Sequence, residues 1–332
     1  MNKIEKIYTM EKDVEKEMIL MVTGLIDKGL SKSGDPFVSV EMFDGIKKIK
    51  VNFFNDTVES LSKREVIKGS ILKVKLTHGS NGYYNQSGWD VISDGSISEK
   101  DFAYVAPIDP EECFEWLVGK IKAVDPNPEE VGPYKSLSSL TVKLLEKNAD
   151  AFKRSSAAVT MHHNFLSGLI YHTVRMVSMA IKTCEVYRAL DKELLVCGTA
   201  LHDIGKISCY ETTDYGDASV TLEGRLLDHA LVGIMMIHDE AKEGSYDPEK
   251  LIQLEHLLAS HHGKKEWDAI TTPAFPEAMM LHVIDLADSR MNMFEEAYKE
   301  QKAGTISDDK IYGLENSHIY KPLIYEENSI NI

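Results

Sequence analysis

Cysteine and long apolar runs are scarce in this 332-residue sequence. The four cysteines, Cys113, Cys184, Cys197 and Cys209, are scattered and form no C-x-x-C pair. This spacing argues against a thiolate zinc site and against a disulfide framework, and it suits a reducing compartment. No apolar stretch reaches the ~18 residues that span a bilayer. The charged N-terminal segment also contains no apolar core of a signal peptide. We therefore expect a cytoplasmic protein with no membrane segment.

Positive charge is also in short supply, since 53 acidic residues against 37 lysines and arginines give a formal net charge of −16. Residues 1–105 are nearly neutral, with 15 Lys/Arg and 16 Asp/Glu, so residues 106–332 carry a net charge of −15. An acidic body repels a polyanion at long range. Binding of nucleic acid by this chain would therefore need local cations or metal ions.

The first part of the chain, residues 18–98, has the pattern of short strands. Residues 37–43, 46–54 and 70–79 alternate between apolar and polar side chains, and the clusters "KSGDP" and "HGSNGYYNQSG" between runs predict turns. This pattern predicts a small antiparallel barrel, which at this size resembles an OB-fold. The expected inward residues are Val38, Val40, Met42, Ile49, Val51, Phe53, Leu72, Val74 and Leu76.

From residue 111 onward the apolar residues follow a helical period, in the segments 111–124 and 136–153 and in five further helices. The length is enough for two domains. We predict a two-domain protein in which an N-terminal all-β, OB-fold-like barrel precedes an all-α helical bundle. The expected boundaries are 1–105 for the barrel, 106–155 for a helical linker region, 156–305 for the bundle and 306–332 for a tail.

Histidine is concentrated in the bundle, where ten of the twelve lie between His162 and His282. A single His in an apolar helix is more often a hydrogen-bonded core residue than a ligand. Here five successive helices each bring a metal-capable side chain to an otherwise apolar position, and buried ionisable groups need partners. The candidate metal ligands are His172, His202, Asp203, His229, His261, His262 and Asp285.

The chemistry of this set is imidazole plus carboxylate without sulfur, which suits Mn, Fe, Zn or Ni. With Asp203 shared, the donors are enough for two adjacent divalent ions. Such a centre lowers the pKa of a water molecule and holds both the attacking and the leaving oxygen of a phosphodiester. We expect Asp203 and Lys206 to be catalytic, with the Lys206 ammonium facing a non-bridging phosphate oxygen.

The order His172, His202-Asp203, Asp285 resembles that of the HD-domain metal-dependent phosphohydrolases. The segments "MHHNFLSGLIYHTVRM", "LHDIGKI", "LASHHGKKEW" and "LHVIDLADSRMNMFEEA" strongly resemble the YhaM family of 3′→5′ exoribonucleases, also known as the CMP-binding-factor family. This resemblance implies an HD-type bundle in which His229 and His261 serve the second metal, while His262 supplies a ligand or a substrate contact. Asp228 departs from the small residue expected before His229.

Candidate nucleic-acid contacts lie on both parts of the chain. In OB-folds, aromatic side chains stack on bases beside a cationic groove. The alternative is that edge lysines prevent strand aggregation and that the aromatics cap the barrel. In the bundle, His163 and Lys264 are either substrate contacts or solvated side chains. The barrel candidates are Lys48, Lys50, Phe54, Lys73 and Lys75 on strands and Tyr83, Tyr84 and Trp89 in a loop.

We therefore predict a metal-dependent phosphodiesterase, a 3′→5′ exonuclease that degrades single-stranded RNA, and single-stranded DNA as a further substrate, to nucleoside 5′-monophosphates. The expected cofactor is two divalent ions, with Mn²⁺ favoured and Fe, Ni, Co, Zn or Mg left open. One alternative is a phosphohydrolase of a free nucleotide or cyclic dinucleotide. Another is a non-catalytic nucleic-acid-binding module with a degenerate metal site. Assembly into a homo-oligomer is also left open.

Overall fold

The computed structural model describes residues 4–31, 33–80, 82–126, 132–159 and 165–325. It divides the chain into two compact units, Met1–Tyr104 and Val105–Ile332. Each unit has its own apolar core.

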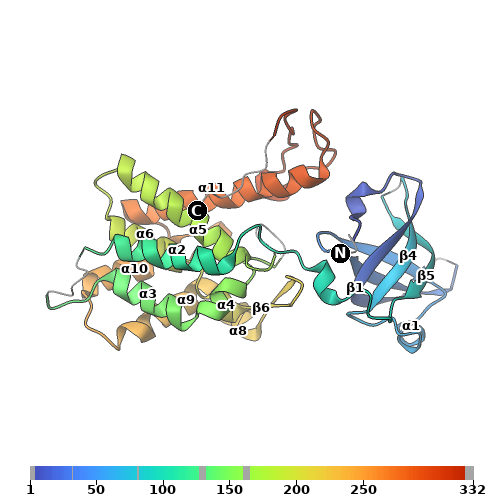
Figure 1. Cartoon of the computed structure of the whole chain (residues 1–332), viewed down its shortest axis with the longest axis horizontal. Coiled ribbons are helices and arrows are strands. Elements are labelled where there is room, and N and C mark those ends of the chain that lie inside the picture. The colour runs from blue at the N-terminus through green and yellow to red at the C-terminus, as the bar shows by residue number, and fades with distance from the viewer. Residues whose placement is uncertain (1–3, 32, 81, 127–131, 160–164, 326–332) are drawn as a thin grey trace. The chain divides into compact units, whose positions relative to one another are not determined.

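The first unit is a closed five-stranded barrel with the strand order β1-β2-β3-β5-β4 (Figure 1). β1 pairs antiparallel with both β2 and β4, while β3 and β5 are parallel, with Val51 opposite Tyr84. A register shift between Val22 and Gly24 lies within β1, the strand that pairs with both β2 and β4. The elements are η1 (Ile7–Thr9), β1 (Glu15–Leu30), β2 (Pro36–Phe43), β3 (Lys48–Phe54), α1 (Val58–Lys63), β4 (Ile71–His78), β5 (Tyr84–Val91) and η2 (Glu99–Phe102).

The barrel core confirms the alternation seen in the sequence. All nine expected inward residues of β2, β3 and β4 are at most 5% exposed. On the same strands Phe54 is 51% exposed. The period of two therefore predicted which face of each strand is buried, because successive strand side chains point to opposite faces.

The turn expected from the cluster "HGSNGYYNQSG" is shorter in the structure than in the prediction. Strand β5 begins at Tyr84, so Tyr84 and Trp89 lie on a strand and not in a loop. The turn is closed by the hydrogen bond from the Gly79 amide to the Tyr83 carbonyl. Asn, Gln, Ser and Gly have low strand propensity, so the strand is formed by its pairing with β3 and β4 and not by its own composition.

The second unit is mainly helical, with one two-stranded sheet, and most of its longer helices are visible in Figure 1. Asp109, Ser136, Asp191 and Asp247 each cap a helix N-terminus with a side-chain oxygen. The elements are α2 (Pro110–Ala123), α3 (Leu137–Lys147), α4 (Ala149–Arg154), α5 (Gly168–Val186), α6 (Lys192–Leu201), α7 (Lys206–Cys209), β6 (Tyr210–Thr212), β7 (Ala218–Val220), α8 (Leu222–Leu227), α9 (His229–Ala241), α10 (Pro248–Ser260), η3 (Lys265–Trp267), α11 (Pro276–Glu300) and η4 (Tyr312–Leu314).

Two segments differ in detail from the expected organisation. The single helix expected over 136–153 is two helices, α3 and α4, because Asn148 ends one and caps the other. The region 106–155, expected as a helical linker, contributes Cys113, Leu117, Leu140 and Phe152 to the core of the second unit. Its amphipathic helices bury their apolar faces there, so the structure includes them in this unit.

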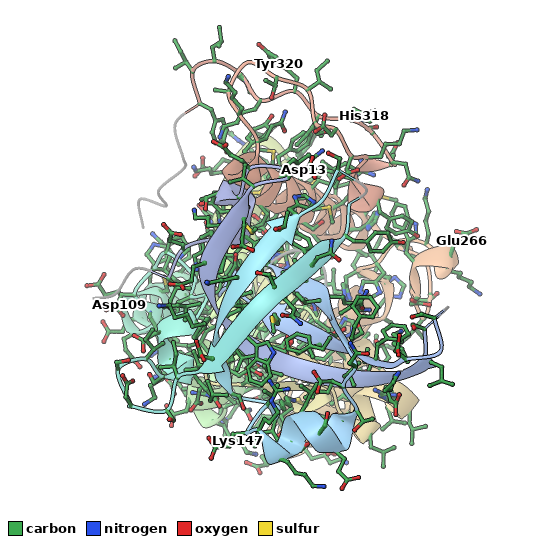
Figure 2. All side chains as sticks on the ribbon, turned by 90° about the vertical axis from the view of Figure 1, so that its right-hand side faces the viewer. Asp13, Asp109, Lys147, Glu266, His318 and Tyr320 are labelled. Carbon is green, nitrogen blue, oxygen red and sulfur yellow. The ribbon has the colours of Figure 1, made fainter. Side chains whose placement is uncertain are left out.

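The segment after α11 folds back along that helix. Isolated bridges join Ile306 to Tyr320 and Ile311 to Ser317, and the hydroxyl of Tyr298 on α11 donates to the Tyr320 carbonyl. His318 and Tyr320 of this segment are labelled in Figure 2. Among the described residues, no helix has the length and apolar character needed to cross a membrane.

Candidate metal centre

The candidate ligands come together in the second unit from five helices and the turns that follow them. Five of the ligands are buried, and the other two are partly exposed. The elements and their residues are α5 with His172, the end of α6 with His202 and Asp203, α9 with His229, the end of α10 with His261 and His262, and α11 with Asp285.

Gly205, in the motif "HDIGK", allows the turn after α6 to approach the start of α9. A Cβ at this position would overlap the carbonyl oxygen of His229 and the amide of Gly233. Only glycine permits this approach. The glycine therefore sets the spacing between Asp203, two residues earlier, and His229.

The two carboxylate oxygens of Asp203 face different histidines. Oδ2 lies 3.2 Å from Nε2 of His202 and 3.8 Å from Nε2 of His172. Oδ1 lies 3.3 Å from Nε2 of His229 and 3.8 Å from Nε2 of His261. The Asp203 carboxylate therefore lies between two sets of imidazole nitrogens.

Ligand atoms gather into two groups on the two sides of Asp203. In each group, one atom from every residue lies within 4.8 Å of the others. Asp285 belongs to the first group, where its Oδ1 lies 3.4 Å from Nε2 of His172. The first group is His172, His202 and Asp285, and the second is His229, His261 and His262.

Four of these histidines are held in the same tautomer. Each ring directs Nδ1 at a protein acceptor, so that in the neutral ring Nδ1–H donates and Nε2 carries the lone pair toward the centre. Orientation by an outer acceptor is the usual arrangement of metal-ligating histidines. The acceptors are Asp288 Oδ2 for His172 (2.7 Å), the Thr199 carbonyl for His202 (2.8 Å), Asp228 Oδ1 for His229 (3.1 Å) and the Leu258 carbonyl for His261 (2.7 Å).

The inward atoms fit a bound cation. Within the described residues, the buried Nε2 of His202 and Oδ1 of Asp203 have no hydrogen-bond partner. Nε2 of His229 lies 3.4 Å from Nε2 of His261, so two imidazole nitrogens converge at this point. Each buried polar atom without a partner costs roughly 1–3 kcal/mol. Divalent cations that accept imidazole and carboxylate donors satisfy all of these atoms.

The charges of the centre are strongly coupled. Burial by itself raises the pKa of the Asp203 carboxyl, but His202 and Lys206 hold that pKa well below its usual range. Burial lowers the pKa of His172, yet Asp285 and Asp288 outweigh it and raise that pKa to about 9. The pKa of His261 is well below its usual value because of burial and the neighbouring histidines. Its neutral ring is the form that ligates a metal.

Lys206 places its ammonium beside the shared carboxylate. Its Nζ donates to Asp203 Oδ2 at 2.7 Å, and the residue is 7% exposed. Burial lowers the pKa of Lys206, but the Asp203 charge outweighs this and raises it, so the side chain stays cationic. A pocket of about 400 Å³ is lined by Asp203, Lys206, His229, His262 and Asp285, together with Trp267 and other residues. The pocket gives a small substrate access to the buried ligands.

A charge network lies outside the centre. Sequence reasoning indicated that Asp288 could orient a ligand, but it missed Arg175 and Glu295. Asp288 accepts from His172 and also receives Nε of Arg175 at 2.6 Å. Arg175 in turn forms a bidentate pair with Glu295. Arg175 lies one turn after His172 on α5, and this spacing is the sequence signal that could have indicated it. The network holds the ring of His172 in place.

Asp228, the unexpected residue before His229, has two contacts. Its carboxylate accepts from the Ala230 amide at the start of α9 and lies 3.1 Å from Nδ1 of His229. Burial raises the pKa of Asp228, but the His229 ring holds it far below the usual range. Its backbone has φ 66° and ψ 152°, a conformation that is costly for a residue with a Cβ. The departure therefore orients a ligand.

The barrel lysines are all on the outer face of their strands, and acidic side chains lie next to Lys50 and Lys73. Lys50 pairs with Glu41 at 3.5 Å, and Lys73 pairs with Glu17 at 2.7 Å. Lys48 and Lys75 are exposed on β3 and β4. In the closed barrel β5 separates these two strands. The four lysines therefore do not form one continuous row.

The barrel aromatics fall into two sets. Phe54 and Tyr83 are exposed, and Phe54 stacks on Phe37 with ring centroids 5.6 Å apart. Trp89 packs against the barrel core, with the guanidinium of Arg64 4.1 Å from its ring centroid. Tyr84 also packs against that core. Phe54 and Tyr83 are thus the more accessible of the four predicted aromatics.

Of the two candidate substrate contacts in the bundle, His163 lies outside the described residues. Lys264 is exposed, and its ammonium lies 4.5 Å from the ring centroid of Trp267. Trp267 lines the pocket that holds the candidate ligands, so Lys264 is close to the edge of that pocket.

The chain is similar to curated proteins over most of its length. It is 31% identical over 301 residues to the 3′-5′ exoribonuclease YhaM of Bacillus velezensis, covering 90% of this chain and 92% of the relative. It is 30% identical to YhaM of Bacillus subtilis, over 90% of this chain and 92% of the relative. It is 31% identical to YhaM of a Geobacillus species, over 93% of each chain.

The chain belongs to the YhaM family of 3′-5′ exoribonucleases. The HD domain family matches residues 169–297, the stretch that contains all seven candidate ligands. The protein is thus a metal-dependent hydrolase, and the sequence prediction of its family is confirmed. No solved structure matches the chain significantly.

Proposed function

We propose that this protein is a 3′→5′ exonuclease that hydrolyses single-stranded RNA, and single-stranded DNA as a second polymer, to nucleoside 5′-monophosphates. The observation that carries the proposal is the position of Asp203, whose two oxygens face two separate sets of imidazole Nε2 atoms. Phosphodiester hydrolysis is the chemistry that two-metal sites commonly perform.

The proposed cofactor is two divalent ions, most simply Mn²⁺, and the mixed nitrogen and oxygen donors also suit Fe, Zn or Ni. His172, His202 and Asp285 would hold one ion, and His229, His261 and His262 the other, with Asp203 shared between them. When bound, the ions supply Lewis acidity that lowers the pKa of a water molecule and neutralises charge on the phosphodiester.

Lys206 is the catalytic cation of the proposal. It is buried, it lines the pocket, and its pKa is raised, so it stays protonated at neutral pH. A fixed ammonium in a site of low dielectric stabilises the charge that develops on a phosphoryl oxygen. Lys206 also donates to Asp203 and so orients the shared carboxylate.

The barrel is proposed to be of the OB type and to hold the strand. Its order β1-β2-β3-β5-β4, closed through β1 and β4, is compatible with that fold. Phe54 and Tyr83 are exposed aromatic side chains on which bases can stack. Lys48 and Lys75, on the outer face of β3 and β4, supply positive charge for the backbone.

The test of this function is digestion of a 5′-labelled single-stranded RNA with Mn²⁺, with products resolved by size and by nucleotide chromatography. We expect a ladder that shortens from the 3′ end and releases nucleoside 5′-monophosphates. Asp203→Ala should abolish the release. Asp239→Ala is the matched control, because Asp239 is an exposed carboxylate that accepts from Lys242. Internal cleavage, or equal release by the Asp203 variant, would contradict the proposal.

A free nucleotide or cyclic dinucleotide remains a second candidate substrate, because a pocket of about 400 Å³ accommodates one nucleotide without any polymer. Substitutions on the barrel distinguish between the two candidate substrates. A Phe54→Ala/Tyr83→Ala double variant should slow RNA degradation and leave hydrolysis of a small phosphodiester unchanged if RNA is the substrate. Equal rates of the double variant and the wild type on RNA would favour the free nucleotide.

A further inference from the structure

The pocket beside the candidate metal centre is lined by two chemical kinds of side chain. Asp203, Lys206 and the histidines are ionisable, whereas Trp267, Leu286 and Val220 are apolar. A nucleoside 5′-monophosphate has the same division, since its phosphate is anionic and its base has apolar faces. The pocket therefore offers both kinds of contact to a single nucleotide.

Among the apolar side chains that line the pocket, Trp267 has the largest flat surface. It remains 41% exposed although it lines a pocket. It lies on the short turn η3, and Figure 2 labels Glu266, the residue before it, on this surface turn. An exposed large apolar side chain in a concave site is typical of a ligand contact.

The turn that carries Trp267 is attached to the ligand pair at the end of α10. Gly263 has φ 79°, and a Cβ there would overlap the ring of His282. The His282 ring in turn shares a hydrogen bond of 2.8 Å, through Nδ1, with the His261 carbonyl. The rings of Trp267 and His282 lie 6.0 Å apart. The position of the indole is therefore coupled to that of a candidate metal ligand.

Lys264 brings a positive charge next to Trp267. Its Nζ lies 4.5 Å from the centroid of the Trp267 ring, within the range of a cation–π contact. This contact keeps the ammonium near the edge of the pocket and helps to hold the indole. An indole accompanied by a cation is a favourable stacking surface for a base that is attached to a phosphate chain.

We propose that Trp267 forms a nucleobase-stacking subsite for the 3′-terminal nucleotide, the one that is released. The inference rests on the proposed exonuclease function, because hydrolysis leaves the scissile phosphate on that nucleotide as its 5′-phosphate. The phosphate then lies at Lys206 and the candidate ligands while the base stacks on the indole. Every base has a π face, so the subsite accepts all four bases.

The test is isothermal titration of the metal-loaded protein with adenosine 5′-monophosphate and with ribose 5-phosphate, which lacks the base. Trp267→Ala should weaken binding of adenosine 5′-monophosphate about tenfold to hundredfold, the effect of one base–aromatic stack. Its affinity for ribose 5-phosphate should stay within about twofold of the wild type, since Lys206 and the candidate ligands, which would contact the phosphate, are unchanged. Trp267→Phe, which keeps a π face, should retain most of the nucleotide affinity.

The outcomes separate this inference from the function on which it rests. Equal weakening of both ligands by Trp267→Ala, or no weakening of adenosine 5′-monophosphate, would overturn the stacking subsite. The stacking subsite would also be overturned if the wild type did not bind adenosine 5′-monophosphate. Failure of the wild type to shorten RNA, with base-dependent binding preserved, would instead overturn the exonuclease and leave the subsite in place. RNA that ends in an abasic nucleotide gives a kinetic check, because kcat/KM for it should be unaffected by Trp267→Ala.

Discussion

The barrel and the helical unit place their polar side chains in opposite ways. In β2, β3 and β4 every expected inward position is apolar, and the lysines lie outside. In the helical unit His172, His202, Asp203, His229 and His261 occupy buried positions on otherwise apolar elements. Exposed charges cost little, whereas buried ones must be paired or must bind a cation. The comparison teaches that a buried polar cluster is the stronger sign of chemistry.

Loss of the shared carboxylate should have the largest effect. Asp203→Ala removes the only side chain among the described residues whose two oxygens face both sets of ligands. Metal ions supply several kcal/mol of transition-state stabilisation, so kcat should fall by at least about 10³-fold. Elemental analysis should show less metal per chain than the wild type. If the Asp203→Ala variant is active and holds as much metal as the wild type, the buried polar cluster of the helical unit is not the reaction centre.

Loss of the proposed catalytic cation, Lys206, should have the next largest effect. Lys206→Met keeps a long side chain but removes the ammonium beside Asp203. We expect kcat for RNA to fall by about 10²–10³-fold, as for removal of one electrostatic donor in an active site. Lys182→Met, on the exposed surface of α5, is the matched control. Steady-state kinetics would check it, and similar loss in both variants would argue against a local role.

The coupled charges predict a pH dependence of stability in the metal-free protein. The pKa of His172 is raised to about 9, above the ordinary value near 6.5, so its stabilisation is complete below about pH 6.5. It is lost as the pH rises through about 9. The free energy of unfolding should decrease by up to about 3 kcal/mol over this range.

Urea denaturation in the presence of a chelator measures this decrease. His172→Gln should flatten the profile between pH 6.5 and 9.5, because the titrating ring is gone. Added metal should also flatten it, since ligation keeps the ring neutral at Nε2. A metal-free wild type equally stable at both ends of the range would show that the buried charges of the helical unit are not coupled as described.

The acceptors behind the ligands should have a moderate effect. Asp288→Asn and Asp228→Asn each weaken the acceptor that orients a histidine, His172 and His229 respectively. Substitution of such outer residues typically costs about 10–100-fold in metal affinity. We expect the larger loss for Asp288, which is buried and also binds Arg175. Competition with a metal indicator gives the affinities, and unchanged values would contradict the orienting role.

Substitutions on the barrel should have the smallest effect. Phe54→Ala and Tyr83→Ala remove exposed rings without disturbing the core. Each should raise KM for RNA by roughly tenfold, the value of one weak stack, and leave kcat unchanged. Val40→Ala is a contrasting variant, because it opens a cavity in the core and lowers stability by about 1–3 kcal/mol. A large change of kcat in the Phe54 or Tyr83 variant would assign the barrel a part in the chemistry.

Much of the fold follows from local patterns in the sequence. The alternation of β2, β3 and β4 identified their buried faces, and capping residues such as Asp109 and Asp247 lie where helices begin. Strand β5 did not show this pattern, because its polar residues form a strand only through pairing with β3 and β4. The break at Asn148 was also missed, since the apolar period continues across it.

The identity of the candidate ligands was visible in the sequence, but their arrangement was not. The sequence order predicted that His172, His202, Asp203 and Asp285 converge. The tautomers depend on acceptors far away in sequence, such as Asp288, which is 116 residues from His172. The position of Trp267 in the pocket could not be predicted for a similar reason, because its turn contacts His282 on α11.

By itself the sequence determined the family, the buried faces of three strands and the residue types of a sulfur-free metal centre, because these depend on composition, spacing and local periodicity. The tertiary structure alone decided that Asp203 faces two groups of nitrogens, that Asp228 orients a ligand and that Trp267 forms a wall of the pocket. These features depend on distances between helices, which packing sets and which no local pattern encodes.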